Sequence, residues 1–149
     1  MSDRKIKYWI IAASKDHVKN GITEGIAQAC HGKAAPLKRM QKGDFVIYYS
    51  GKQFFGKPDR CQEFTAIGKL TGDDVYRFQM TPDFCPSRRN IEFYESNDIS
   101  ILPLINRLDF IKNKKSWGYP FRFGFLEINQ YDFDLISSLM LSEEYDEEY

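Results

Sequence analysis

The chain has 149 residues, 42% hydrophobic and 28% charged, which is typical of one globular domain and argues against a disordered or fibrous protein. Its 21 basic and 21 acidic residues cancel, but the last seven residues, EEYDEEY, hold five of the acids, so residues 1–142 have a net charge of +5. A mildly basic domain over residues 1–142 permits an anionic partner, and residues 143–149 are expected to form a solvated tail that stability does not require.

The cysteines and the hydropathy of the chain indicate which cofactors, location and membrane segments to expect. The three cysteines are widely spaced and no Cys-x-x-Cys pair occurs, so neither a zinc site nor another cofactor is predicted. Reduced thiols are typical of a cytoplasmic protein. No apolar run reaches 18 residues, and the N-terminus lacks a convincing signal-peptide cleavage site, so no membrane segment is expected.

The first third of the chain alternates apolar runs with turn signals. Residues 7–13 (KYWIIAA) are apolar, β-branched and aromatic, which predicts a central strand. Ser14 is placed to cap a short helix that residues 20–21 (NG) would end. Residues 36–40 begin with proline, as short helices often do, and residues 45–49 (FVIYY) predict a second strand.

The remainder continues this pattern as far as a closing helix. Strands are predicted at 64–70, 75–80, 91–94 and 123–128, a helical segment at 101–108, and loops at 50–60, 81–90 and 112–120. Asn129 or Asp132 is expected to cap an amphipathic helix that ends at Met140. Short strands joined by tight turns predict an α+β, mainly β fold: a small, bent, mostly antiparallel barrel with short helices covering its openings.

Two polar clusters near the N-terminus are candidates for chemistry. Ser14, Asp16 and His17 lie close in sequence, but a helix cap at Ser14 followed by surface polar residues explains them better than a catalytic triad, because no nucleophile-elbow context surrounds them. Residues 28–33 (QACHGK) place Gln28, His31 and Lys33 around a glycine. Their donors, acceptors and charge suit the edge of a nucleobase and a phosphate, although His31 could equally be structural and Lys33 merely solvated.

Two further stretches are basic. Residues 114–122 (KKSWGYPFR) interleave cations with aromatic rings, which suits nucleic acid, with Lys114 and Lys115 meeting phosphate; Trp117 and Phe121 could instead close the core. Arg88 and Arg89 are candidate phosphate ligands that precede a strand. Adjacent side chains of a strand point to opposite faces, so at most one of the two is expected to point inward.

The order of these motifs resembles a known family. GIAQACHGK, GDFVIYYS and WGYPFR, together with the runs between them over residues 5 to about 140, resemble the small stand-alone bacterial and archaeal proteins of the EVE domain family. That family belongs to the PUA-like superfamily and is similar to YTH domains, which read methylated adenine in RNA. The resemblance implies a PUA-like β-barrel with a pocket for a flipped, modified base of DNA or RNA.

The resemblance also implies a set of site residues. They are taken from the motif positions of this sequence, and no catalytic residue is among them: Trp9, Ser14, Gln28, His31, Lys33, Tyr49, Trp117, Phe121 and Arg122 for the base, with Arg88 and Arg89 as the basic pair. Gln28, His31 and Trp117 are expected to face one cavity.

Three functions stay open from the sequence. The favoured one is a non-catalytic nucleic-acid-binding module for modified bases, with no membrane partner. The second is an enzyme acting on a nucleotide or modified base, with His31 or His17 as general base. The third is a small-ligand or protein-interaction module.

Overall fold

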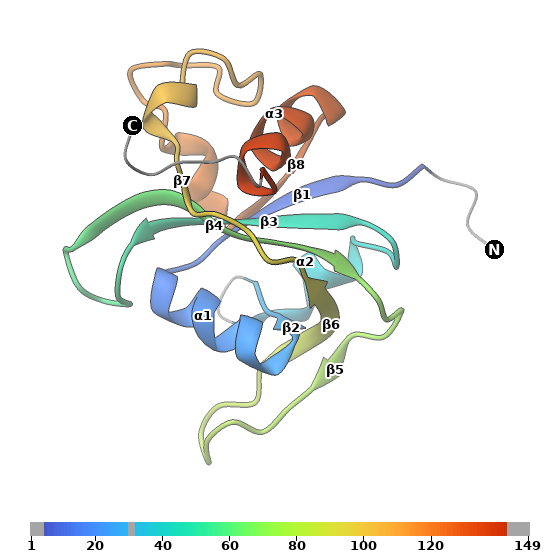
Figure 1. Ribbon diagram of the computed structural model, residues 1–149. Coiled ribbons are helices and arrows are strands. Elements are labelled where there is room, and N and C mark those ends of the chain that lie inside the picture. The colour runs from blue at the N-terminus through green and yellow to red at the C-terminus, as the bar shows by residue number, and fades with distance from the viewer. Residues whose placement is uncertain (1–4, 30–31, 143–149) are drawn as a thin grey trace.

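A strongly curled sheet of eight strands forms the centre of the fold, and short helices lie on both of its faces (Figure 1). The computed structural model describes residues 5–29 and 32–142. The strands are β1 (Tyr8–Ala12), β2 (Ile26–Ala27), β3 (Phe45–Lys52), β4 (Arg60–Leu70), β5 (Tyr76–Arg77), β6 (Ser87–Phe93), β7 (Ile99–Ser100) and β8 (Phe125–Ile128). The helices are α1 (Lys15–Glu24), α2 (Ala34–Lys38) and α3 (Gln130–Met140), and 3-10 turns lie at Leu102–Leu104 and Tyr119–Phe123.

The strand order is β2-β6-β4-β3-β1-β8, with β5 added to β6 and β7 added to β4. The pairing of β1 with β3 is parallel and the other pairings are antiparallel. Register shifts between β3 and β4 bend the long strands, and Gly68 lets β6 pass closely, since a Cβ there would lie 2.6 Å from the carbonyl oxygen of Glu92. The described strands therefore form a half-barrel, which confirms the predicted mainly β, bent fold.

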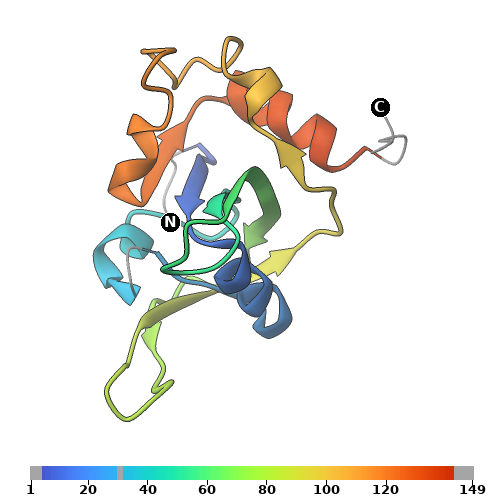
Figure 2. The same cartoon turned by 90° about the vertical axis from the view of Figure 1, so that its left-hand side faces the viewer.

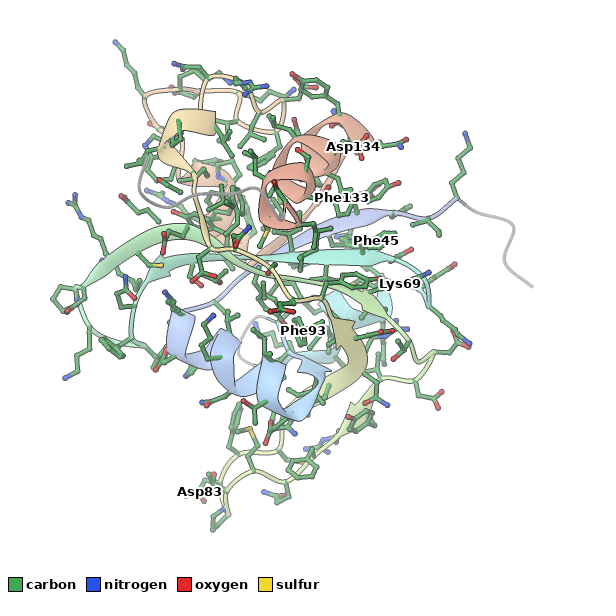
Figure 3. The ribbon with its side chains drawn as sticks, viewed as in Figure 1. Phe45, Lys69, Asp83, Phe93, Phe133 and Asp134 are labelled. Atoms are coloured by element: carbon green, nitrogen blue, oxygen red, sulfur yellow. The ribbon has the colours of Figure 1, made fainter. Side chains whose placement is uncertain are left out.

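The sheet buries an apolar core on each face. Ile10 and Ile47 pack beneath α3, whereas Trp9 and Ile11 pack on the side of α1 and α2, because successive strand residues point to opposite faces. Figure 3 shows this division: Phe45 and Phe133 lie on the α3 side, 5.2 Å apart between ring centroids, and Phe93 lies on the other side. The two faces can therefore carry two separate surfaces.

The helix caps agree with the sequence in one case and not in another. Asn129 caps α3 as predicted, accepting a hydrogen bond of 2.8 Å from the backbone N–H of Asp132. The predicted end of the first helix at residues 20–21 is wrong, because α1 continues to Glu24 and Gly25 supplies the left-handed cap at φ 68°. A glycine inside a helix costs only about 1 kcal/mol, which packing overrides.

Several other boundaries differ from the predicted ones. Residues 87–90, predicted as loop, open strand β6, so Arg88 and Arg89 are strand residues. Residues 101–108 form a 3-10 turn and turns rather than a regular helix. The strand predicted at 75–80 is reduced to β5. In the part of the chain that the structure describes, no helix is long and apolar enough to span a bilayer. The predicted acidic tail, 143–149, lies outside the described residues.

Candidate functional site

The main cavity has a volume of about 600 Å³ and lies beside α1, on the face of the sheet opposite α3. The end of β1, helix α1, strand β2, the loop after β3 and the β5–β6 hairpin contribute to its walls. Figure 2 looks onto the molecule with α1 in blue beside the green loop that follows β3. Its volume is in the range of small-ligand pockets, about 300–1,000 Å³.

A glutamine held by an arginine forms the polar part of this cavity. Arg88 is only 3% exposed, and its Nε donates a 2.7 Å hydrogen bond to Oε1 of Gln28. The same guanidinium lies 3.4 Å from the carboxylate of Glu24 and 4.3 Å above the ring of Phe78. Because arginine can only donate, the side-chain oxygen of Gln28 faces Arg88, and the amide N–H groups are the donors that Gln28 can offer to a ligand.

The backbone of Gln28 is held as well as its side chain, by a buried tyrosine. The hydroxyl of Tyr48 accepts a hydrogen bond from the backbone N–H of Gln28 and donates one to the backbone carbonyl of Gln28, both at 3.3 Å. Burial raises the pKa of Tyr48, outweighing the hydrogen bond to Gln28, so this phenol stays neutral. Fixed donors of this kind recognise one arrangement of acceptors without reorganising.

Exposed aromatic and apolar side chains surround the opening. Phe54 and Phe55 are 53% and 59% exposed, and the ring of Phe55 stacks on His17 with 5.0 Å between centroids. Met80 and Phe84 contribute from the β5–β6 hairpin, whose Asp83 projects away from the sheet (Figure 3). Rings left in solvent at the rim of a cavity supply stacking faces for a flat ligand.

Asp16 holds the aromatic rim against α1. Its carboxylate accepts from the hydroxyl of Ser14 at 2.5 Å and from the backbone N–H groups of His17 at 2.9 Å and Phe55 at 3.2 Å. Burial by itself raises the pKa of Asp16, but these hydrogen bonds outweigh it and leave the pKa below the ordinary value. The backbone N–H of Asp16 in turn donates to the carbonyl of Gln53. The hydrogen bonds of Asp16 to Gln53 and Phe55 therefore join α1 to the loop after β3.

A second cavity of about 330 Å³ lies beyond the end of β3. The rings of Tyr49 and Phe121 line it and stack on each other with 3.9 Å between centroids. Trp117 and Lys115 line it as well. The expectation that Gln28 and Trp117 face one cavity is wrong. Trp117 packs with the core on the α3 side of the sheet, and the sequence does not reveal on which side a loop will dock.

Two predicted ligands are core residues instead. Trp9 is 1% exposed, and its Nε1 donates to Asp44 at 2.9 Å. Arg89 is 2% exposed and donates to the carbonyls of Leu37, Met40 and Gly72. Direct contacts of these two with a base or phosphate are therefore ruled out. The expectation that at most one arginine of the pair points inward also fails, because both faces of β6 are covered.

The other predicted residues lie in different surroundings. Ser14 lines the main cavity, while Lys33 and Arg122 are exposed and line neither cavity as described. Lys114 donates from Nζ to the carbonyls of Ile105 and Leu108, both at 3.1 Å, and so stabilises its own loop. His31 lies outside the described residues.

Sequence reasoning missed the aromatic rim and its anchor. The signal was present in residues 50–60 (SGKQFFGKPDR), where two adjacent phenylalanines occur in a loop too rich in glycine, lysine and proline to bury them. The sequence predicts Asp16 only as a surface polar residue after the Ser14 cap, because nothing in the sequence shows that its carboxylate reaches Phe55.

The curled half-barrel with short helices is a fold of the PUA-like kind. The chain belongs to the EVE domain family, whose model matches residues 7–139. It is 44% identical over 132 residues to a "UPF0310 protein" of Mycobacterium avium (strain 104), covering 89% of this chain and 96% of that one. It is 48% identical over 128 residues to a "UPF0310 protein in gntR 5'region" of Bacillus licheniformis, covering 86% and 87%.

Solved structures share the fold at low sequence identity. A hypothetical protein from Leishmania major aligns with a TM-score of 0.60 at 10% identity, covering 89% of this chain and 93% of that one. The Pho92 YTH domain, solved in complex with m6A, aligns with a TM-score of 0.59 at 15% identity, covering 98% and 90%. These neighbours agree with the PUA-like fold that the resemblance implied.

Proposed function

We propose that this chain is a non-catalytic nucleic-acid-binding module that holds a flipped, modified nucleobase in the main cavity. The observation that carries the proposal is the Gln28–Arg88 pair: a buried guanidinium fixes the glutamine so that its amide can donate to a base edge. Extruding a base costs a few kcal/mol, which edge hydrogen bonds and stacking on the rim can offset.

The rim supplies the second requirement, a stacking face. Phe54, Phe55 and Phe84 surround the opening, and stacking of one base on an aromatic side chain is worth about 1–3 kcal/mol. The structural neighbour solved with m6A, a YTH domain, adds support, since it shows that a related fold accommodates a methylated base.

The test is titration of nucleosides into the parent protein and into Gln28→Glu, measured by calorimetry. The probes are N6-methyladenosine, 5-methylcytidine and their unmodified parents. Glutamate keeps a partner for Arg88 but replaces the amide donor by a carboxylate, so we expect about tenfold weaker binding with the fold intact. Gln130→Glu, at an exposed position at the start of α3, is the matched control and should bind like the parent.

Two outcomes would favour other functions. Turnover of a nucleoside or oligonucleotide would indicate an enzyme, with His17 in the main cavity as the first candidate base and His31 the second. Ligand binding that does not respond to salt, with no affinity for any oligonucleotide, would indicate a small-molecule or protein-interaction module, because phosphate contacts release counterions.

Lys33 remains a proposed phosphate contact, and Arg122, which the resemblance placed at the base, is now proposed for the same role, since both are exposed cations outside the two cavities. Replacing either by alanine should lower the slope of log affinity against log salt by about one unit. We also propose a cytoplasmic location, which suits the free thiols of Cys61 and Cys85.

A further inference from the structure

The second cavity is a basic surface. Its charged lining residues are Lys52, Arg60 and Lys115, and no carboxylate lines it within the described part of the chain. None of the three cations forms an ion pair with a described residue; Lys52 Nζ makes a long contact of 3.4 Å with the carbonyl of Pro58. Cations left unpaired around one hollow attract an anion.

The walls of this cavity are aromatic and fixed in place. The ring of Phe121 lies between Tyr49, stacked at 3.9 Å, and Phe110, which meets it edge-on at 5.7 Å. Trp117 is half-buried and packs against the core beneath α3. A tryptophan held at the rim of a cationic hollow is the combination found in sites for single-stranded nucleic acid.

The two cavities are neighbours across the end of β3. Gly51 and Lys52 line both of them. Gly51 places no side chain between the cavities, and the flexible Lys52 can reach a phosphate on either side of the boundary. A strand with one base in the main cavity can therefore continue past Lys52 into the second cavity.

We propose that the second cavity binds the nucleotide adjacent to the flipped one, within a single-stranded segment. Trp117 stacks on its base, and Arg60 and Lys115, with Lys52, neutralise the flanking phosphates. This inference rests on the proposed function, because the path of the nucleic-acid strand starts from a base in the main cavity. The stacking on Trp117 and the phosphate contacts can nevertheless be measured without any modified base.

Intrinsic fluorescence gives the direct test. The chain has two tryptophans, and Trp9 is buried, so quenching by added nucleic acid reports on Trp117. Unmodified oligothymidylate and oligouridylate of about ten nucleotides, within the length that single-strand sites occupy, are titrated at low salt. We expect quenching in at least one arm, and comparison of the arms distinguishes DNA from RNA. Trp117→Phe should remove the quenching and retain most of the affinity measured by anisotropy.

The cations are tested by Arg60→Ala and Lys115→Ala. Each should weaken binding of the oligonucleotides and lower the salt slope by about one unit. Lys112→Ala changes an exposed lysine of the same loop that does not line the cavity, and it should have no such effect. Trp117→Ala should weaken binding roughly tenfold; if it does not fold, Trp117→Phe and the two cation variants decide the question.

Absence of quenching in both arms would overturn the proposal, and so would cation variants that behave like Lys112→Ala. Nucleosides separate this failure from failure of the proposed function. If nucleoside binding depends on Gln28 but the Arg60→Ala and Lys115→Ala variants bind oligonucleotides like the parent, the base pocket is supported and the second site is contradicted. Quenching and cation effects without any nucleoside binding would retain the second site and remove the base pocket.

Discussion

Gln28 and Arg88 lie 60 residues apart in the sequence and form one unit in the structure. A glutamine next to a cavity has two possible amide orientations, and a buried donor-only neighbour selects one of them. The recognition that we propose for Gln28 would therefore depend on Arg88, which orients the amide. Arg88 was predicted as a phosphate ligand, but its guanidinium is buried between Glu24, Gln28 and Phe78.

Arg88→Ala should lower both stability and affinity. It removes the donor to Gln28 and leaves the amide free to turn, with an expected loss of about 1–3 kcal/mol in the free energy of unfolding. Denaturant titration measures the loss, and nucleoside titration of the folded variant measures the effect on affinity. Arg77→Ala, at an exposed position of β5, is the control; equal effects at the two sites would contradict the assigned role.

Trp9→Phe should affect stability alone. The indole Nε1 donates to buried Asp44, so its loss leaves an acceptor with one partner fewer and costs about 1–3 kcal/mol. Ligand affinity of the folded variant should equal that of the parent. If Trp9→Phe weakened base binding without lowering stability, Trp9 would have to contact the ligand, which contradicts its assignment to the core.

At the scale of elements, α1 and the loop after β3 act together. Asp16 joins them through its carboxylate and its own N–H, and Phe55 carries one of those hydrogen bonds. The rim of the main cavity is therefore positioned by the first turn of α1 rather than by the loop itself.

Asp16→Asn should destabilise the protein by about 1 kcal/mol at neutral pH and weaken nucleoside binding, because the rim is released. The pKa of Asp16 is lowered in the folded protein. Its stabilising contribution is thus present above the ordinary pKa of about 3.9 and is lost as the pH falls through the lowered value. The difference between parent and variant, measured by thermal unfolding, should vanish in acid; Asp134→Asn on α3 is the control.

The long elements were predictable and the short ones were not. The strands that became β1 and β3, and helix α3 with its Asn129 cap, follow from apolar runs and a capping residue. β2 and β7 have two residues each, too few for any period to appear, yet β2 is what leads the chain to Gln28. The sequence also predicted a polar site around Gln28, but the burial of Arg89 and Trp9 depends on helices packed from elsewhere in the chain.

At the scale of the molecule, charge is unevenly distributed. Ending the chain after Ser142 removes five acids and leaves a net charge of +5. The melting temperature should stay nearly unchanged, and oligonucleotide affinity at low salt should rise, since the removed charges repel phosphate. A melting temperature lower by many degrees would show that the tail stabilises the domain.

The curved sheet lies between the surroundings of the two cavities. Because its two faces carry different residues, the one site predicted from the sequence is divided into two. Gln28 belongs to the side covered by α1 and α2, and Trp117 packs on the side covered by α3. Among the described residues, only Gly51 and Lys52, at the end of β3, line both cavities. Long-range packing of this kind cannot be inferred from spacing along the chain.

The central claim is that the Gln28 amide contacts a base in the main cavity. The most direct measurement is the nuclear magnetic resonance signal of the Gln28 side-chain NH₂ group in ¹⁵N-labelled protein, during titration with N6-methyladenosine and with 5-methylcytidine. The account predicts that at least one of them shifts this signal and the backbone amide of Phe55, while the NH₂ signal of Gln130 stays in place. Saturable shifts confined to other surfaces, or no shift at Gln28 with either nucleoside, would contradict it.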